Sequence, residues 1–218
     1  MKNKIIFLSL FLMGAVVNSF SQQIIKKDAE IDAMVKEISV DSLAQNLNKL
    51  VSFGTRATLS NQTSTTKGIG AARAWILSRF NEYAKSSNGR LSAFIDTITY
   101  NADKRRVNRP IILGNVVATL KGTDPNDKRI FVISGHLDSR RSNDMDSVGD
   151  SPGANDDGSG TVAVMECARV MSKHSFPATL IFVTVSGEEQ GLLGAYFMAN
   201  KAKKENWKIE AVLNNDIM

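Results

Sequence analysis

Acidic side chains and one histidine gather just after several apolar segments of this chain. They are His136 and Asp138 after IFVISG, Asp156 and Asp157 in GANDDGSG, Glu188 and Glu189 after TLIFVTVSG, and Asp216 after AVLNN. A strand interior disfavours Asp and Glu, so acids at strand exits need a separate reason to be there. In an open α/β sheet the carboxyl ends of the strands face one crevice, where ligands bind. Carboxylates that meet in one crevice repel one another unless a cation lies between them. The pattern therefore predicts a divalent metal centre, with zinc as the metal.

The spacing within these groups suggests separate roles for neighbouring residues. His136 and Asp138 are two residues apart at a strand end, so they share a face, and the acid can orient the imidazole ring. Glu188 and Glu189 are adjacent, so their side chains diverge, and one can bind metal while the other acts as a base. Taken singly, these features also fit a surface ion pair, a capped turn and a solvated helix start. The loop around Asp156 lacks the alternating oxygen ligands and the closing Glu of a calcium loop.

The N-terminal residues predict export. Lys2 and Lys4 precede an apolar run over residues 5–17, and Ser19-Phe20-Ser21 offers a small-x-small cleavage site. The apolar run is short for a membrane span, so we expect cleavage after Ser21, a periplasmic or extracellular location and no stable membrane association afterwards. The expected division is a signal peptide over 1–21, a leader over 22–40 and, over 41–218, the domain that carries the predicted metal centre.

Composition bounds the remaining possibilities. The 218 residues fit one domain, and 43% hydrophobic residues can build a substantial core. The formal net charge of the chain is +5, and two of its lysines lie in residues 1–21. So modest a positive charge gives no reason to expect nucleic-acid binding. Cys167 is the only cysteine, so no internal disulfide is possible, and its helical context indicates a small core residue. We expect His174 to be solvent-exposed in the last turn of a helix. Nothing here fixes the oligomeric state.

Periodicity predicts alternating strands and helices. The helices are expected from Asp41 as N-cap, over 67–85, over 159–173 and over 190–204; the strands are expected over 91–100, 114–122, 129–135, 179–187 and from 210. Two of the strands are continuous apolar runs, as in a sheet covered on both faces. This order indicates an α/β fold with a mixed, partly parallel sheet. The chain stops two residues after Asp216, and we expect it to be the N-terminal portion of its domain.

In its motifs the chain resembles the co-catalytic di-zinc exopeptidases typified by secreted bacterial leucyl-type aminopeptidases, metallopeptidase family twenty-eight. The resemblance extends from about Leu43 to Met218 and rests on SGHLDS, PGANDDGSG, SGEEQGLLGA and NND, in that order. The PGANDDGSG stretch separates this family from related di-zinc carboxypeptidases and aminoacylases. The resemblance implies a three-layer α/β/α sandwich of the zinc-aminopeptidase type, incomplete at the C-terminus, and a peptide substrate.

The resemblance also implies a role for each site residue. His136, Asp156 and Asp216 would hold one zinc ion. Asp156 would bridge to a second zinc ion bound by Glu189 and a later histidine. Glu188 would be the general base, Asp138 would orient His136, and the Asp156-Asp157 peptide would be cis.

The chain departs from the family pattern at one ligand, because the last zinc-binding histidine should lie beyond Asp216. We therefore expect this polypeptide to hold at most one zinc ion tightly and to have little peptidase activity by itself. Two alternatives stay open: a single-zinc acyltransferase of the glutaminyl-cyclase type, and a non-catalytic receptor-like domain of the same fold.

Overall fold

A mixed five-stranded sheet forms the centre of the molecule. The computed structural model describes residues 27–103 and 105–218. The strands are β1 (Leu91–Tyr100), β2 (Ile111–Leu120), β3 (Arg129–His136), β4 (Thr179–Val185) and β5 (Lys208–Asn214), in the sheet order β1-β2-β4-β3-β5. Strand β3 pairs in parallel with β4 and β5, whereas β2 pairs antiparallel with β1 and β4. The prediction of a mixed, partly parallel α/β sheet is confirmed.

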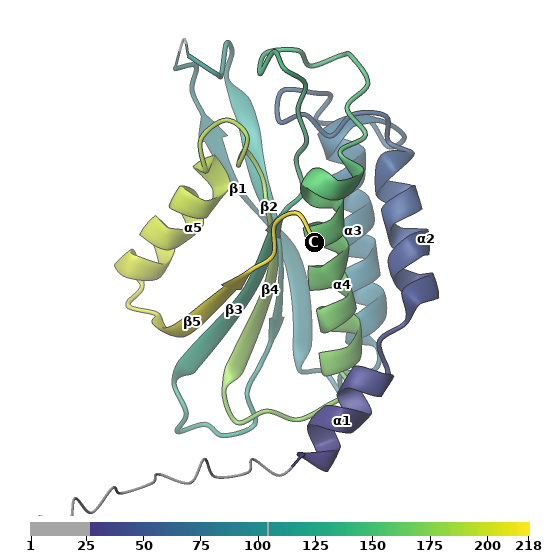
Figure 1. The fold of residues 1–218 in the computed structure, drawn as a ribbon. Coiled ribbons are helices and arrows are strands. Elements are labelled where there is room, and N and C mark those ends of the chain that lie inside the picture. Colours follow the sequence, from purple (N-terminus) through teal and green to yellow (C-terminus); the bar gives the residue numbers. More distant parts are fainter. Residues whose placement is uncertain (1–26, 104) are drawn as a thin grey trace, which may run out of the picture.

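Helices cover both faces of this sheet. They are α1 (Ala29–Lys36), α2 (Val40–Val51), α3 (Gly68–Ala84), α4 (Gly160–Met171) and α5 (Leu193–Lys204). Figure 1 shows α2, α3 and α4 on one side of the sheet and α5 on the other, which makes three layers. No helix in the described ranges is long and apolar enough to cross a membrane.

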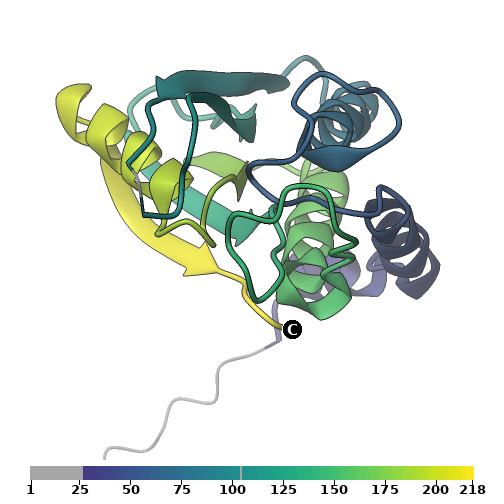
Figure 2. The same ribbon diagram turned by 90° about the horizontal axis from the view of Figure 1, so that it is seen from above.

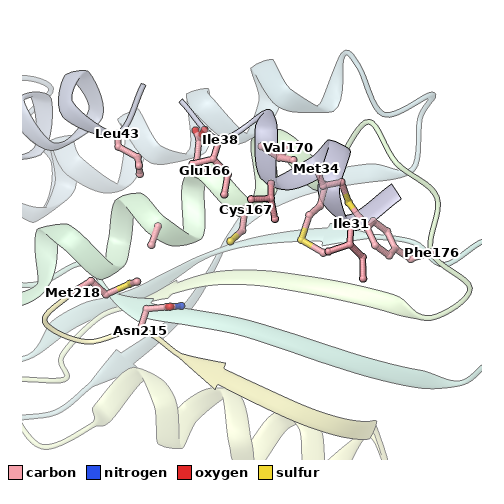
Figure 3. A pocket seen from close by; sticks show the side chains of 13 residues that line it. Ile31, Met34, Ile38, Leu43, Glu166, Cys167, Val170, Phe176, Asn215 and Met218 are labelled. Carbon is pink, nitrogen blue, oxygen red and sulfur yellow. The ribbon is translucent and has the colours of Figure 1, made fainter. Parts of the chain in front are cut away.

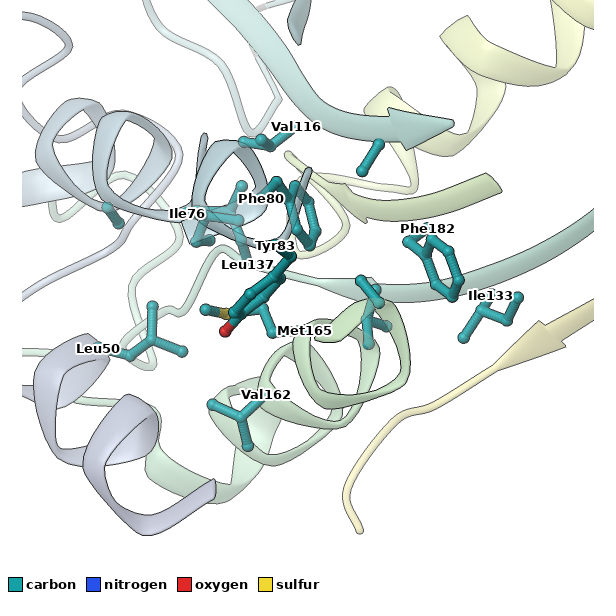
Figure 4. Close-up of a cluster of buried hydrophobic side chains, with 14 of the residues drawn as sticks. Leu50, Ile76, Phe80, Tyr83, Val116, Ile133, Leu137, Val162, Met165 and Phe182 are labelled. Carbon is teal, nitrogen blue, oxygen red and sulfur yellow. The ribbon is translucent and has the colours of Figure 1, made fainter. Parts of the chain in front are cut away.

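Alternation along β3 and β4 divides the core between the two faces. Ile133 and Phe182 belong to the large cluster beneath α3 and α4 (Figure 4). Val132 and Val183 point to the opposite face, where Met198 of α5 packs against them. Successive strand residues point to opposite faces, so a continuous apolar run supplies both layers at once.

The sequence located the elements well but missed some of their ends. Strand β2 begins at Ile111, three residues before the predicted start at Gly114. The prediction of Asp41 as N-cap of α2 is wrong, because the Ser39 hydroxyl accepts the Ser42 N–H at 3.1 Å and α2 begins at Val40. Ser39 and Asp41 both have the chemistry of an N-cap, so the sequence alone does not decide between them.

Two predictions about the N-terminal part remain as they were made. The signal peptide over 1–21 lies outside the described residues, and the division at residues 21 and 40 stays a prediction. Within the predicted leader, α1 is a short amphipathic helix that begins at Ala29 and has Asp28 as its N-cap.

The carboxyl ends of the parallel strands β3, β4 and β5 lie at the same edge of the sheet. After β5 the chain returns toward the start of α4, as both ribbon views show (Figures 1 and 2). There the Met218 N–H donates to the Ser159 hydroxyl at 2.9 Å, and the Asn215 N–H donates to the Ser134 carbonyl at 2.8 Å. The acids that follow β3 and β5 are thereby brought beside the glycine-rich loop, residues 153–160.

Candidate metal centre

The imidazole of His136 lies at the centre of the acidic cluster. His136 ends β3 and is 4% exposed. Its backbone N–H donates to the Asp157 carboxylate at 2.8 Å, and its carbonyl accepts the Thr161 hydroxyl at 2.9 Å. On the ring, Nδ1 lies 3.1 Å from the Asp138 carbonyl oxygen. With Nδ1 engaged in this way, Nε2 is the nitrogen that faces the neighbouring acids.

Three carboxylates from separate segments approach Nε2 of His136. The Asp156 Oδ1 atom lies 3.2 Å away, Asp216 Oδ1 lies 3.7 Å away and Glu188 Oε2 lies 4.0 Å away. Two ligand atoms of a tetrahedral zinc ion are about 3.3 Å apart, given bonds of about 2 Å. The His136, Asp156 and Asp216 donors therefore have the chemistry and the spacing of one zinc site.

The acids around His136 favour the protonated form of its ring. Burial lowers the pKa of His136, but hydrogen bonding to Asp138 and the charges of Asp138, Asp157 and Glu188 outweigh it and raise this pKa to about 10. The imidazolium partly offsets repulsion among the acids. Metal binding at this position would displace that proton, because a histidine ligand must be neutral.

Asp156 and Asp157 are joined by a cis peptide bond, and their carboxylates have different surroundings. By distance alone, one ligand atom each from His136, Asp157 and Asp216 lie within 4.8 Å of one another. The Asp157 carboxylate is 0% exposed and already accepts the backbone N–H groups of His136, Gly160 and Ile217. Its oxygens are thus occupied by the fold. Asp156 instead has a half-exposed carboxylate directed at Nε2, which favours Asp156 over Asp157 as a ligand.

Asp138 connects three segments of the site. Its buried carboxylate accepts the Thr58 hydroxyl at 2.8 Å and the backbone N–H groups of Glu188 and Glu189 at 3.2 Å. The carboxylate oxygen nearest to His136 Nδ1 lies 3.7 Å away, farther than the Asp138 carbonyl. The main hydrogen-bonding role of this carboxylate is therefore to fix the segment that carries the two glutamates.

The two adjacent glutamates diverge, as the sequence suggested. Burial raises the pKa of Glu188, whose carboxylate lies near His136. The Glu189 carboxylate turns toward Arg140, whose Nε lies 3.2 Å from Oε2. Burial and then the charges of Asp156 and Asp138 raise the pKa of Glu189 to about 7. Glu189 thus feels the charge of Asp156 but is not among the acids within 4 Å of Nε2.

Sequence reasoning missed several residues that surround the site. Arg56, Thr58 and Arg140 were not among the predicted site residues. All three contact the site through hydrogen bonds or charge, which leave no periodic pattern in a sequence.

The prediction for His174 is wrong. Its side chain is 19% exposed rather than free in solvent, and Nε2 lies 2.8 Å from Glu37 Oε1. The cause is the segment between α1 and α2, which lies against the C-terminal end of α4 and brings Glu37 to it. Cys167, as predicted, packs against the core from α4.

An apolar hollow of about 570 Å³ lies apart from the acidic cluster. It is bounded by α1, α4 and the last residues of the chain, among them Met34, Cys167 and Met218 (Figure 3). Its one carboxylate, Glu166, is held by Arg169 at 2.6 Å. The hollow therefore offers mainly apolar surface and contains none of the candidate metal ligands.

Comparison with known proteins agrees with this geometry. Residues 115–218 match the model of peptidase family M28. A protein named "Probable zinc metalloprotease" from Leptosphaeria maculans is 45% identical over 191 residues, which are 88% of this chain and 44% of that protein. One of the same name from Pyricularia oryzae is 44% identical over 88% of this chain and 38% of its own length. This chain thus spans less than half the length of these relatives.

Solved structures place the fold in the same group. The LapA aminopeptidase of Legionella pneumophila is 26% identical, with a TM-score of 0.65 over 88% of this chain and 48% of its own. The glutaminyl cyclase of Porphyromonas gingivalis, 19% identical, reaches a TM-score of 0.65 over 83% of this chain and 61% of its own, and this likeness concerns the fold alone.

The α/β fold is of the zinc-aminopeptidase type, and the two similar proteins are named probable zinc metalloproteases. Through residues 115–218 the chain is similar to peptidase family M28.

Proposed function

We propose that this protein is a zinc-dependent exopeptidase, and specifically an aminopeptidase that hydrolyses N-terminal residues from peptides. The observation that carries the proposal is the convergence of Asp156, Asp216 and Glu188 on Nε2 of His136. Likeness to the LapA aminopeptidase at 26% identity supports the choice of aminopeptidase.

Each residue then has a role set by its position. His136, Asp156 and Asp216 would hold one zinc ion, and Asp156 and Glu189 would contribute ligands to a second. Zinc, when bound, acts as a Lewis acid and lowers the pKa of water at the site. Glu188 accepts the proton of the attacking water, since its carboxylate is close to the cluster and burial raises its pKa. Asp138 keeps Glu188 in place through the Glu188 N–H.

We also propose that the protein is exported to the periplasm or the extracellular space. The support is the sequence of residues 1–21, with its two lysines, its short apolar run and its Ser19-Phe20-Ser21 step. N-terminal sequencing of the protein recovered from outside the cytoplasm tests this, and the expected mature N-terminus is Gln22. Recovery of an intact Met1 N-terminus would contradict the proposal.

The activity is tested on the protein as its gene encodes it, with zinc and after chelation. We expect release of the N-terminal residue from free aminoacyl substrates, no action on N-acetylated ones, and loss of activity with the chelator that zinc restores. Ammonia release from an N-terminal glutamine peptide would instead reveal a glutaminyl cyclase. Zinc binding without turnover of either substrate would indicate a receptor-like domain.

A further inference from the structure

Residues 54–58, which we name the strap, lie between the end of β3 and the glycine-rich loop. The Gly54 carbonyl accepts the Ser151 N–H at 2.8 Å, and the Arg56 N–H donates to the Ser139 hydroxyl oxygen at 3.1 Å. The Ser139 hydroxyl in turn donates to the Ser151 carbonyl at 2.7 Å. The strap thus holds together two segments that are more than ten residues apart in sequence.

Arg56 makes the most extensive contacts of the strap. Its side chain is 0% exposed. Nε donates to the Leu137 carbonyl at 2.7 Å, Nη1 to the Pro152 carbonyl at 2.6 Å and Nη2 to the Gly153 carbonyl at 2.9 Å. A planar guanidinium presents its donors in a rigid fork, so these three bonds fix the two segments in one relative orientation.

The carbonyls that Arg56 binds belong to the segments that carry the candidate ligands. Leu137 directly follows His136, and Gly153 lies three residues before Asp156. The loop has little freedom to adjust, because Gly153 has a φ of +46° and an added Cβ would come within 2.5 Å of the Asp156 carbonyl oxygen and of the Ser139 Cβ. A shift of the guanidinium would therefore be transmitted to the distance between the His136 ring and the Asp156 carboxylate.

The charge of Arg56 has no directly bonded acid in the described structure, since all three partners are neutral carbonyls. Burial lowers the pKa of Arg56 to about 10, while the charges of Asp138, Asp157 and Asp156 act to raise it. The residue is therefore a cation at neutral pH, placed behind a group of carboxylates. It reduces their mutual repulsion without occupying any carboxylate oxygen that a metal would need.

We propose that Arg56 is a positioning residue of the metal centre, which sets the separation of His136 and Asp156 by clamping the Leu137, Pro152 and Gly153 carbonyls. The proposal rests on the proposed function only in that a zinc ion is the occupant of this cluster. It assigns a role to a residue outside the stretch that matches the family model, which begins at residue 115.

The chain offers a matched control in Arg73. Arg73 is also buried, 5% exposed, and donates to the Ile112 carbonyl at 2.9 Å and to the Gln62 side chain. Burial lowers the pKa of Arg73 to about 10 as well. It lies on α3 beside β2, and it bonds directly to none of the Leu137, Pro152 and Gly153 carbonyls.

The test compares Arg56→Lys with Arg73→Lys. Lysine keeps the charge but cannot bind three carbonyls with a rigid fork. Zinc affinity is measured by competition with a chromophoric chelator, and folding of the metal-free variants by circular dichroism. We expect Arg56→Lys to bind zinc about 10- to 100-fold more weakly, the range for residues that support metal ligands, and Arg73→Lys to match the parent protein.

Equal zinc affinity in the two folded variants would overturn the proposal. If Arg56→Lys does not fold, Ser139→Ala carries the test, because it removes the acceptor of the Arg56 N–H and the donor to Ser151. Unchanged zinc affinity in Ser139→Ala would then overturn it, and weakened affinity with an intact fold would support it. A parent protein that binds no zinc would instead refute the proposed function, so the two failures are distinguishable.

Discussion

Asp156 and Asp157 show how two identical neighbouring side chains acquire different roles. The Asp157 carboxylate is buried and accepts three backbone N–H groups, from β3, from the start of α4 and from the segment after β5. Asp156 accepts none of these bonds and directs its carboxylate at His136. Asp157 therefore stabilises the fold of the site, and Asp156 is available to a metal.

We predict opposite effects for the two asparagine substitutions. Asp157→Asn places an amide NH₂ against backbone donors, so it should lower the free energy of unfolding by about 2 kcal/mol, the cost of unsatisfied buried groups. Asp156→Asn should leave the metal-free fold as stable as before and abolish tight zinc binding. Denaturant unfolding and chelator competition measure the two quantities. Loss of zinc binding in a fully stable Asp157→Asn variant would reverse the assignment.

The two glutamates after β4 should also separate by experiment. Glu188→Gln should retain zinc and lower kcat, because the carboxylate that accepts the proton is lost while the ligands remain. Glu189→Gln should weaken one zinc ion. Metal analysis together with steady-state kinetics on the gene-encoded protein distinguishes them, and the opposite pattern would mean that the two roles are exchanged.

At the scale of residues, the sequence indicated the acids of the candidate site but not the residues that hold them in place. His136, Asp156 and Asp216 could be found because each follows an apolar run or lies in a glycine-rich loop, and parallel strands end together. Which of two adjacent aspartates faces the metal depends on backbone N–H directions, which no spacing reveals. Arg56 was missed because its partners are carbonyls of distant segments.

At the scale of elements, α1 is tied to α4 through side chains at its C-terminal end. Glu37 directly follows α1 and contacts Lys173 Nζ at 2.6 Å and His174 Nε2 at 2.8 Å. The Ser39 N–H and the Ser42 hydroxyl bind the Glu166 carboxylate of α4, which also holds Arg169. These bonds fix the start of α2 and explain why the cap falls at Ser39 rather than at Asp41.

The Glu37 contacts predict a pH dependence. Lys173 and then His174 lower the pKa of Glu37 below its ordinary value of 4.5. A carboxylate with a depressed folded-state pKa stabilises the fold above its unfolded pKa, and this contribution is lost as the pH falls through the folded pKa. Glu37→Gln should therefore lower Tm at pH 7, and the difference from the parent should vanish in acid, as the pH falls through the lowered folded-state pKa of Glu37.

Glu82→Gln is the control for this prediction. Glu82 has a Lys partner at the same 2.6 Å distance, and its pKa is also lowered, but that partner is Lys85 of the adjoining turn. Its loss should leave the docking of α1 unchanged. Limited proteolysis before α2 should therefore accelerate in Glu37→Gln alone. Equal cleavage rates in both variants would show that Glu37 does not hold α1.

At the scale of the whole molecule, apolar surface is concentrated along one side. Strand β5 is the edge of the sheet beside β3, and its Val212 and Leu213 side chains are 57% and 55% exposed. The apolar hollow beside α1 and Met218 lies near the same end (Figure 3). An edge strand with exposed apolar residues and unpaired backbone groups tends to pair with another chain.

We therefore predict that the polypeptide over residues 27–218 self-associates when it is expressed alone. Leu213→Lys should reduce this association, because it replaces an exposed apolar side chain on the edge strand with a charge. Glu210→Lys is the matched control, since it adds positive charge to the same exposed strand and removes no apolar surface. Sedimentation velocity over a range of concentrations measures the effect. If Glu210→Lys disperses the protein as well as Leu213→Lys does, charge alone governs association. If neither substitution changes it, the β5 edge is not the contact surface.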